Sequence, residues 1–340
     1  MATSKHIESV SFDKLFSINV PHILEAIFLS LDYEAFKMCC NVNKTWSKLL
    51  TAESYQKKAK VMFHEDILDD EKNLYHAAEK GKKNEVEILL STGLVDINSV
   101  GGRQFNRLLG WWSDTALCGA AQYGHKDVVK LLLDLGAEPN KAASYGITPL
   151  YIATANNQKD VVGILLNNGA EPNCENRTWW GGTPLHLGAR SGYKDVVQIL
   201  LEGGADPNKT DRFGQTSLHE AARKDRKEMA KLLLARGADP NKTDKEGLTS
   251  LLVAAEKGHQ DVVKLLLDGG AEPNKANRSG WTPLHWVARK DHKNLAQVLL
   301  DGGADPTKAN HNGKTPLDIA KNHCHIHVVK VLLGEEPIEA

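Results

Sequence analysis

Apolar and polar positions recur along most of the chain with one period. A Thr-Pro-Leu or Thr-Ser-Leu element is followed by a polar turn, a second apolar run and a Gly-Ala-x-Pro segment. Successive elements lie 33 residues apart, with one interval of 35. A weaker copy starts at Thr115, and the elements begin at Thr148, Thr183, Thr216, Thr249, Thr282 and Thr315. A fixed period of this length predicts a repeat architecture.

Local signals predict two helices and a hairpin in each unit. Thr is a good N-cap residue, and Pro suits the first helical position, where its missing N–H needs no partner. The second helix carries an apolar run, which in one unit includes Val262, Val263 and Leu265. We expect Leu265 at a core position. Gly270 can adopt the positive φ that ends a helix, and the Pro that follows prevents continuation.

The first helix of each unit has a small apolar face. On a helical wheel, Leu185, Gly188 and Ala189 fall within about 100° of one another. Leu187 and Arg190 lie on the opposite side. Because so thin a helix pair cannot bury its apolar face alone, neighbouring copies must stack into a solenoid.

These units resemble ankyrin repeats. The unit TPLHLGARSGYKDVVQILLEGGADPN, which starts at Thr183, follows the family pattern nearly residue by residue. The resemblance covers residues 72–334 and implies about eight repeats, the first and last degenerate. It implies an all-α fold, an ankyrin-repeat solenoid of helix pairs with β-hairpin fingers. An insertion of about ten residues is expected within residues 99–112, because the first, degenerate unit begins at Lys72, 43 residues before Thr115.

The N-terminal part does not repeat. Residues 15–58 indicate three short helices, the first from 19 or 21 to 30 and the others over 33–42 and 44–51, and residues 59–71 form a short acidic connector. A module this small can bury little apolar surface on its own. It should therefore need a partner surface.

The same N-terminal residues resemble an F-box. The matching elements are Val20-Pro21, Leu31-Asp32 and Val42 to Trp46, although Val20 replaces the usual Leu and Tyr55 a common Trp. The resemblance implies a small three-helix F-box-like module whose residues contact the Skp adaptor of a cullin ligase or pack behind that contact. These residues are Val20, Pro21, Ile23, Leu24, Ile27, Leu31, Val42 and Trp46. The alternative is that residues 15–58 are a helical cap on the first repeat.

Composition narrows the compartment and the partners. With 42 Lys and Arg against 43 Asp and Glu, the net charge of -1 gives no overall attraction for nucleic acid or an anionic membrane. The five cysteines are scattered and read as reduced thiols. No secretory signal or membrane-spanning run is present in the sequence. We expect a cytoplasmic or nuclear protein without a membrane partner.

The sequence predicts no enzyme, no cofactor and no metal site. His186, His219 and His285 occupy one slot in three repeats, which favours local hydrogen bonding over a single active site. Phosphate-binding loops, zinc-protease motifs and nucleophile motifs are missing. The tract from His323 to His327 looks like a metal tract, but alignment places His325 in the ordinary turn slot between two helices.

Stacking should align the exposed positions of successive first helices into a groove. In the four units from Thr183, these positions hold six basic residues and two acidic ones, Glu220 and Glu256, together with Val253. We expect the groove to bind an acidic segment, with Trp and Arg as hot-spot residues. Exposed Lys and Arg that only keep the solenoid soluble are the alternative. The candidate substrate-binding residues are Trp179, Trp180, Arg190, Arg212, Phe213, Arg223, Lys224, Lys257, Arg278, Trp281, Trp286, Arg289 and Lys290.

Together these patterns predict a substrate-recognition subunit of a cullin-type ubiquitin ligase. The F-box-like module would bind the Skp adaptor and thereby the cullin scaffold, and the ankyrin groove would bind a protein substrate. Catalysis would come from proximity to a separate conjugating enzyme. The alternatives are an ankyrin scaffold without a ubiquitin role, and a pathogen protein that borrows a host ligase.

Overall fold

The computed structural model describes residue 34 and residues 64–335, with gaps at 92, 107–109 and 179. The adaptor-binding residues predicted between Val20 and Trp46 therefore lie outside the described residues. The chain divides into two units, one formed by residues 1–70 and 84–96 and the other by residues 71–83 and 97–340. Among the described residues, α6 (His64–Glu79) and α7 (Lys83–Leu90) precede the other elements. Helix α6 is continuous across residues 71 and 72, where the sequence pattern placed the end of the connector and the start of the repeats.

Seven helix pairs follow in the described part of the second unit. A short 3-10 turn, η1 (Ser144–Gly146), lies before the second pair. The pairs are α8 (Ala116–Tyr123) with α9 (Lys126–Asp134), α10 (Pro149–Ala155) with α11 (Lys159–Asn167), α12 (Pro184–Ser191) with α13 (Lys194–Glu202), α14 (Ser217–Arg223) with α15 (Lys227–Ala235), α16 (Ser250–Lys257) with α17 (Gln260–Asp268), α18 (Pro283–Lys290) with α19 (Lys293–Asp301), and α20 (Pro316–Asn322) with α21 (Ile326–Leu333).

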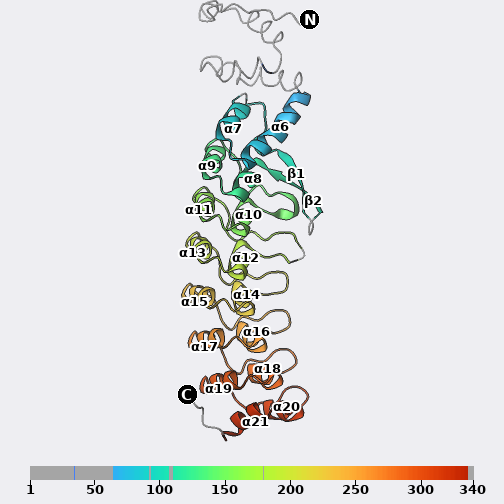
Figure 1. Cartoon of the computed structure of the whole chain (residues 1–340), viewed down its shortest axis with the longest axis vertical. Coiled ribbons are helices and arrows are strands. Elements are labelled where there is room, and N and C mark those ends of the chain that lie inside the picture. The colour runs from blue at the N-terminus through green and yellow to red at the C-terminus, as the bar shows by residue number, and fades with distance from the viewer. Residues whose placement is uncertain (1–33, 35–63, 92, 107–109, 179, 336–340) are drawn as a thin grey trace, which may run out of the picture. The chain divides into compact units, whose positions relative to one another are not determined.

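The pairs stack in two layers, as the repeat pattern predicts. Each first helix packs against the first helix of the next repeat, and each second helix packs against the next second helix. In Figure 1 the first helices α8 to α18 form the middle column, the second helices α9 to α19 lie to the left, and the loops between repeats project to the right. The predicted solenoid is confirmed.

Each first helix begins at a capped threonine. Thr115, Thr148 and Thr249 accept a hydrogen bond from a backbone N–H three residues later. The apolar face of α12 is buried as predicted, because Leu185 and Ala189 are at most 1 % exposed. Two expectations were wrong in detail. Val253 is 2 % exposed rather than part of the open face, and Leu265 is only half-buried.

The core position in α17 is Leu266 rather than Leu265. Leu266 is 0 % exposed, as are Val262 and Val263. Residue 266 lies one helical turn after residue 262, so both side chains face the interior together. Leu265 lies 100° away on the wheel and is partly open to solvent.

The inserted segment forms a β-hairpin. β1 (Val100–Asn106) pairs antiparallel with β2 (Gly110–Thr115), and the register is irregular between Val100 and Gly102. Gly101 lies at this irregularity, where a Cβ atom would collide with the backbone carbonyl of Glu71. The inserted segment is thus an extended finger that leads directly into α8.

The later fingers are hydrogen-bonded turns rather than the paired strands that a hairpin would contain. At one of them, the N–H of Asp211 donates to the carbonyl of Gln215, 2.9 Å away. The Asp211 Oδ1 atom accepts from the N–H groups of Phe213, at 2.8 Å, and Gln215, at 2.9 Å. Asp244, Asn277 and Asn310 build the equivalent turns. Among the described residues, strands are limited to β1 and β2.

Asparagines between the repeats connect each one to the next. Asn241 donates from Nδ2 to the carbonyl of Gly270, 3.0 Å away, and its Oδ1 accepts from the N–H of Glu272 at 2.8 Å. The same two-bond bridge is made by Asn140, Asn173, Asn208 and Asn274. Thr307 takes this position after α19, and its N–H and hydroxyl donate to Asp305 Oδ1, at 2.8 and 2.7 Å.

Candidate protein-binding surface

The basic residues of the predicted groove come from the last turns of four stacked first helices. Arg190, Lys224, Lys257, Arg289 and Lys290 are exposed there, at or next to the C-terminal ends of α12, α14, α16 and α18. Cations in the last helical turn are stabilised by the negative end of the helix dipole. The stacking therefore places a row of positive charge along one edge of the first helices.

Glu220 changes the charge expected for this row. We expected it to be exposed, but its side chain is only 3 % exposed. Its carboxylate lies 3.8 Å from Arg190 Nε and 3.3 Å from Arg223 Nη1. A buried carboxylate needs such partners, because removing it from water without them is costly. Arg190 and Arg223 are therefore both paired with Glu220. Lys224, the third cation here, makes no ion pair with the described residues.

A cavity of about 260 Å³ opens beside this ion-paired group. The Arg190 guanidinium lies 5.6 Å from the centre of the Trp180 ring, within cation–π range. Trp180, expected at a finger tip, is buried and 9 % exposed, whereas Phe213 is 43 % exposed. The cavity is lined by Trp180, Arg190, Phe213, Gln215, Glu220, Arg223 and Lys224.

A second aromatic group lies three repeats further along the stack. The rings of Trp281 and Trp286 are 4.9 Å apart at an angle of 49°. The Arg289 guanidinium lies 5.6 Å from the centre of each ring. The indole Nε1 of Trp286 is buried without a hydrogen-bond partner in the structure. Because this atom is closed off from solvent, a partner could reach it only if the aromatic group rearranged.

The remaining predicted substrate-binding residues lie on the fingers. Arg212 and Arg278 are exposed at the tips of two fingers, and Trp179 is not among the described residues. The structure therefore separates the predicted set into two aromatic groups, where finger residues meet the first helices, and a set of cations on the fingers. Gln215 lines the cavity but was not predicted to, because nothing in its spacing marks it as a site residue. Glu220, which was predicted at a groove position but not as a binding residue, also lines the cavity.

The repeated histidines make local hydrogen bonds, as predicted. The Nδ1 atom of His219 accepts from the N–H of Thr216 at 3.1 Å, and Nε2 donates to the carbonyl of Leu248 in the next repeat at 2.9 Å. Burial lowers the pKa of His219 and holds it in this neutral form. His186 and His285 make the same pair of bonds to their own repeat and the next.

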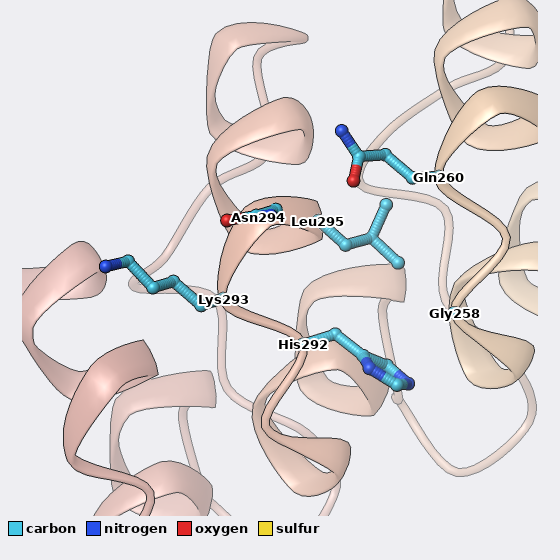
Figure 2. Close-up of a pocket in the computed structure, with 6 residues that line it drawn as sticks. All are labelled: Gly258, Gln260, His292, Lys293, Asn294 and Leu295. Atoms are coloured by element: carbon cyan, nitrogen blue, oxygen red, sulfur yellow. The ribbon is translucent and has the colours of Figure 1, made fainter. Parts of the chain in front are cut away.

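Another hollow, of about 240 Å³, lies between the turns of two neighbouring repeats (Figure 2). Figure 2 shows the His292 ring and the Leu295 side chain extending toward the segment that carries Gly258 and Gln260, while Lys293 points away. Burial, and next the nearby Lys290, lower the pKa of His292. His292 fills the space above Gly258, where a Cβ would lie 2.7 Å from its Nε2. The hollow is a packing gap between repeats.

The histidine-rich tract is a turn, as the alignment predicts. His325 lies between α20 and α21, and its Nδ1 donates a hydrogen bond to the carbonyl of Ala288, 2.8 Å away. Within the described residues, no group of three or more His, Cys, Asp and Glu side chains is placed to hold a metal ion. None of the described helices is long and apolar enough to cross a membrane.

Comparison with known proteins identifies the class. The family model described as "Ankyrin repeats (3 copies)" matches residues 38–143, 74–176, 117–211, 168–244, 185–277 and 251–339. The chain belongs to the ankyrin-repeat family, whose members are protein-interaction scaffolds. No curated protein matches the chain.

A solved structure agrees with this assignment. The chain is similar to the ankyrin repeat domain of Bcl-3, which is described as a unique member of the IkappaB protein family. The TM-score is 0.59 and the sequence identity is 31 %, over 65 % of this chain and 99 % of the Bcl-3 domain.

Proposed function

We propose that the chain is the substrate-recognition subunit of an SCF-like ubiquitin ligase. In this proposal the F-box-like residues 15–58 bind the Skp adaptor and thereby the cullin, and the ankyrin repeats bind a protein substrate with an acidic segment. Substrate binding is supported by the cavity that Trp180, Arg190 and Lys224 line, beside the buried carboxylate of Glu220. The ligase link is supported by the sequence pattern at Pro21, Leu31-Asp32 and Trp46.

The cavity has the parts that a protein-binding hot spot needs. Trp180 and Phe213 offer apolar surface, and Arg190 is held in place between the Trp180 ring and Glu220. A preorganised arginine loses little freedom on binding. Lys224 adds a positive charge that can attract an acidic segment and set its register.

The ligase link is tested by affinity purification of the full chain from cells. Pro21→Asp with Leu24→Asp should abolish copurification of the Skp adaptor and cullin, because both positions belong to the F-box-like pattern. A matched variant, Ser4→Asp with Ser9→Asp, adds the same charge outside residues 15–58 and should retain both partners. Undiminished copurification with the Pro21 and Leu24 variant would refute the ligase link.

One observation favours the rival function, an ankyrin scaffold with no ubiquitin role. The family match begins at residue 38, inside the segment that resembles an F-box. If residues 15–58 only cap the first repeat, neither adaptor nor cullin copurifies with the wild-type chain. The wild-type arm of the same purification therefore distinguishes the two functions.

Substrate binding is tested with lysines rather than arginines. Arg223 would be an unclear probe, because its loss leaves Glu220 with one partner fewer. Lys224→Gln, Lys257→Gln and Lys290→Gln together should weaken substrate binding and its salt dependence. The matched control changes Lys130, Lys231 and Lys264, which are exposed on the second helices. Proximity labelling that returns the same proteins from both variants would contradict the groove assignment.

A further inference from the structure

Four fingers carry a basic residue at one equivalent position. In each case the cation directly follows the Asn or Asp whose side chain builds the turn, which is buried in three fingers and partly buried at Asn277. Only two of the four belonged to the predicted substrate-binding set. The four residues, called here the finger row, are Arg177, Arg212, Lys245 and Arg278.

Backbone hydrogen bonds fix the spacing of the finger row. The N–H of Arg212 donates to the carbonyl of Trp180 on the preceding finger at 3.3 Å. The N–H of Lys245 donates to Phe213 at 2.9 Å, and that of Arg278 to Glu246 at 3.2 Å. Arg177 makes the same bond to the carbonyl of Tyr145. Each cation is therefore held one repeat away from the next.

Glycines on the preceding fingers make room for these residues. Gly181 has a φ of +69°, and a Cβ there would collide with the Arg212 side chain. At Gly247, which has a φ of +80°, a Cβ would lie 3.0 Å from the backbone N and 3.3 Å from Cγ of Arg278. Only glycine combines this backbone conformation with the close approach. The aliphatic stems lie against the neighbouring finger, which limits the freedom of the charged groups.

The charges of the finger row are available to a partner. All four side chains are exposed, and none makes an ion pair within the part of the chain that the structure describes. Glu246 contributes one carboxylate at a tip. Asp211 and Asp244 are buried, and their Oδ1 atoms accept the N–H groups of the turns. The tips therefore present a regular excess of positive charge.

The spacing of the finger row matches one backbone conformation of a partner. Packed helices lie about 8–10 Å apart, so successive fingers advance by about that distance. A polyproline II segment rises about 3.1 Å per residue with three residues per turn, so every third side chain faces the same side about 9 Å further on. In a β-strand, side chains three apart face opposite sides.

We propose that the finger row binds an acidic segment in the polyproline II conformation, with an Asp or Glu at every third residue. The proposal deepens the proposed substrate binding and rests on it, but it does not depend on the ligase link. It names the chemistry and the periodicity of the segment to be recognised. Charge complementarity sets the register, because a shift by one residue turns the acidic side chains away from the cations.

The test measures binding of labelled peptides to the purified full chain by fluorescence anisotropy. One peptide contains four Glu-Pro-Pro triplets, and a second has the same composition with the four Glu residues contiguous. The triplet peptide should bind about tenfold or more tightly than the contiguous one. Arg177→Gln, Arg212→Gln, Lys245→Gln and Arg278→Gln together should remove this preference, with the melting temperature unchanged.

The control variant carries the same loss of charge on the second helices, with Lys126, Lys130, Lys231 and Lys264 changed to Gln. It should keep the preference for the triplet peptide. Equal affinity for the two peptides, or an equal effect of both variants, would overturn the proposal. Tighter binding of a single-stranded oligonucleotide than of the triplet peptide would overturn it in favour of a nucleic-acid surface. Because no adaptor is present, failure of the ligase link leaves the result unchanged.

Discussion

At the scale of single residues, the buried histidines show why a repeated polar side chain need not mark an active site. His219 is 0 % exposed, yet both ring nitrogens have partners, one in its own repeat and one in the next. Its neutral form fits this arrangement, because a proton on Nδ1 would face the N–H of Thr216. The histidine at this position therefore caps the first helix of its own repeat and also bonds to the next repeat.

This arrangement predicts a pH-dependent cost of losing His219. His219→Ala should lower the free energy of unfolding by about 2 kcal/mol or more at pH 7.5, because a backbone N–H and a carbonyl lose their partners. The pKa of His219 is lower in the folded state than in the unfolded state. Below about pH 6.5 the unfolded state therefore binds more protons, and the stabilisation by His219 is lost as the pH falls. The cost of the substitution should therefore shrink below pH 6.5. Urea unfolding from pH 7.5 to pH 5 measures it.

The control for this experiment is His327→Ala, at an exposed position. Its effect should be within about 0.5 kcal/mol at every pH. Burial raises the pKa of Asp114 to about 7, which acts on stability in the opposite sense. That contribution is common to wild type and variant, so it cancels in their difference. A cost of His219→Ala that stays constant with pH would contradict the neutral bridge.

At the scale of elements, the connections between repeats carry polar bridges as well as apolar packing. The Asn241 side chain satisfies a carbonyl and an N–H of the following repeat. Each such bridge lies outside the helices, so it fixes the fingers relative to one another. The cations of the finger row can be evenly spaced only because the fingers themselves are evenly spaced.

Asn241→Ala should therefore destabilise the chain by about 1–2 kcal/mol, because two hydrogen bonds of about 0.5–1.5 kcal/mol each are lost and water can replace part of them. Chemical denaturation monitored by circular dichroism measures the change. Asn312→Ala, on an exposed finger tip, is the matched control and should be close to neutral. Equal effects of the two substitutions would show that the bridge contributes nothing.

Sequence alone predicts the elements well, because their signals are local. The threonine caps, the prolines and the period of 33 residues define the helix pairs and their stacking. Which side chains become buried is harder, because it depends on the neighbouring repeat. Glu220 is buried where Arg190 of the preceding helix α12 and Arg223 of its own helix α14 reach it. Val253 is buried by the packing around α16. Lys245 was not predicted as a binding residue, because only the alignment of the fingers in space places it in a row with Arg177, Arg212 and Arg278.

At the scale of the whole stack, each repeat contacts only its neighbours. In such an array stability is a sum of repeat terms and interfaces between neighbouring repeats. The first helix α16 contacts α14 and α18, and the second helix α17 contacts α15 and α19. A defect in one repeat should therefore weaken its neighbours more than distant repeats.

Leu266→Ala tests this coupling, because it truncates a fully buried side chain in α17, which packs between α15 and α19. The substitution should cost about 2–5 kcal/mol locally, while Lys264→Ala on the exposed side should stay within about 0.5 kcal/mol. Native-state hydrogen exchange should show the largest loss of protection in α15, α17 and α19, and a small loss in α8 and α9. If α8 and α9 lost as much protection as α17, the stack would unfold as one all-or-none unit, and the description by neighbouring interfaces would be wrong.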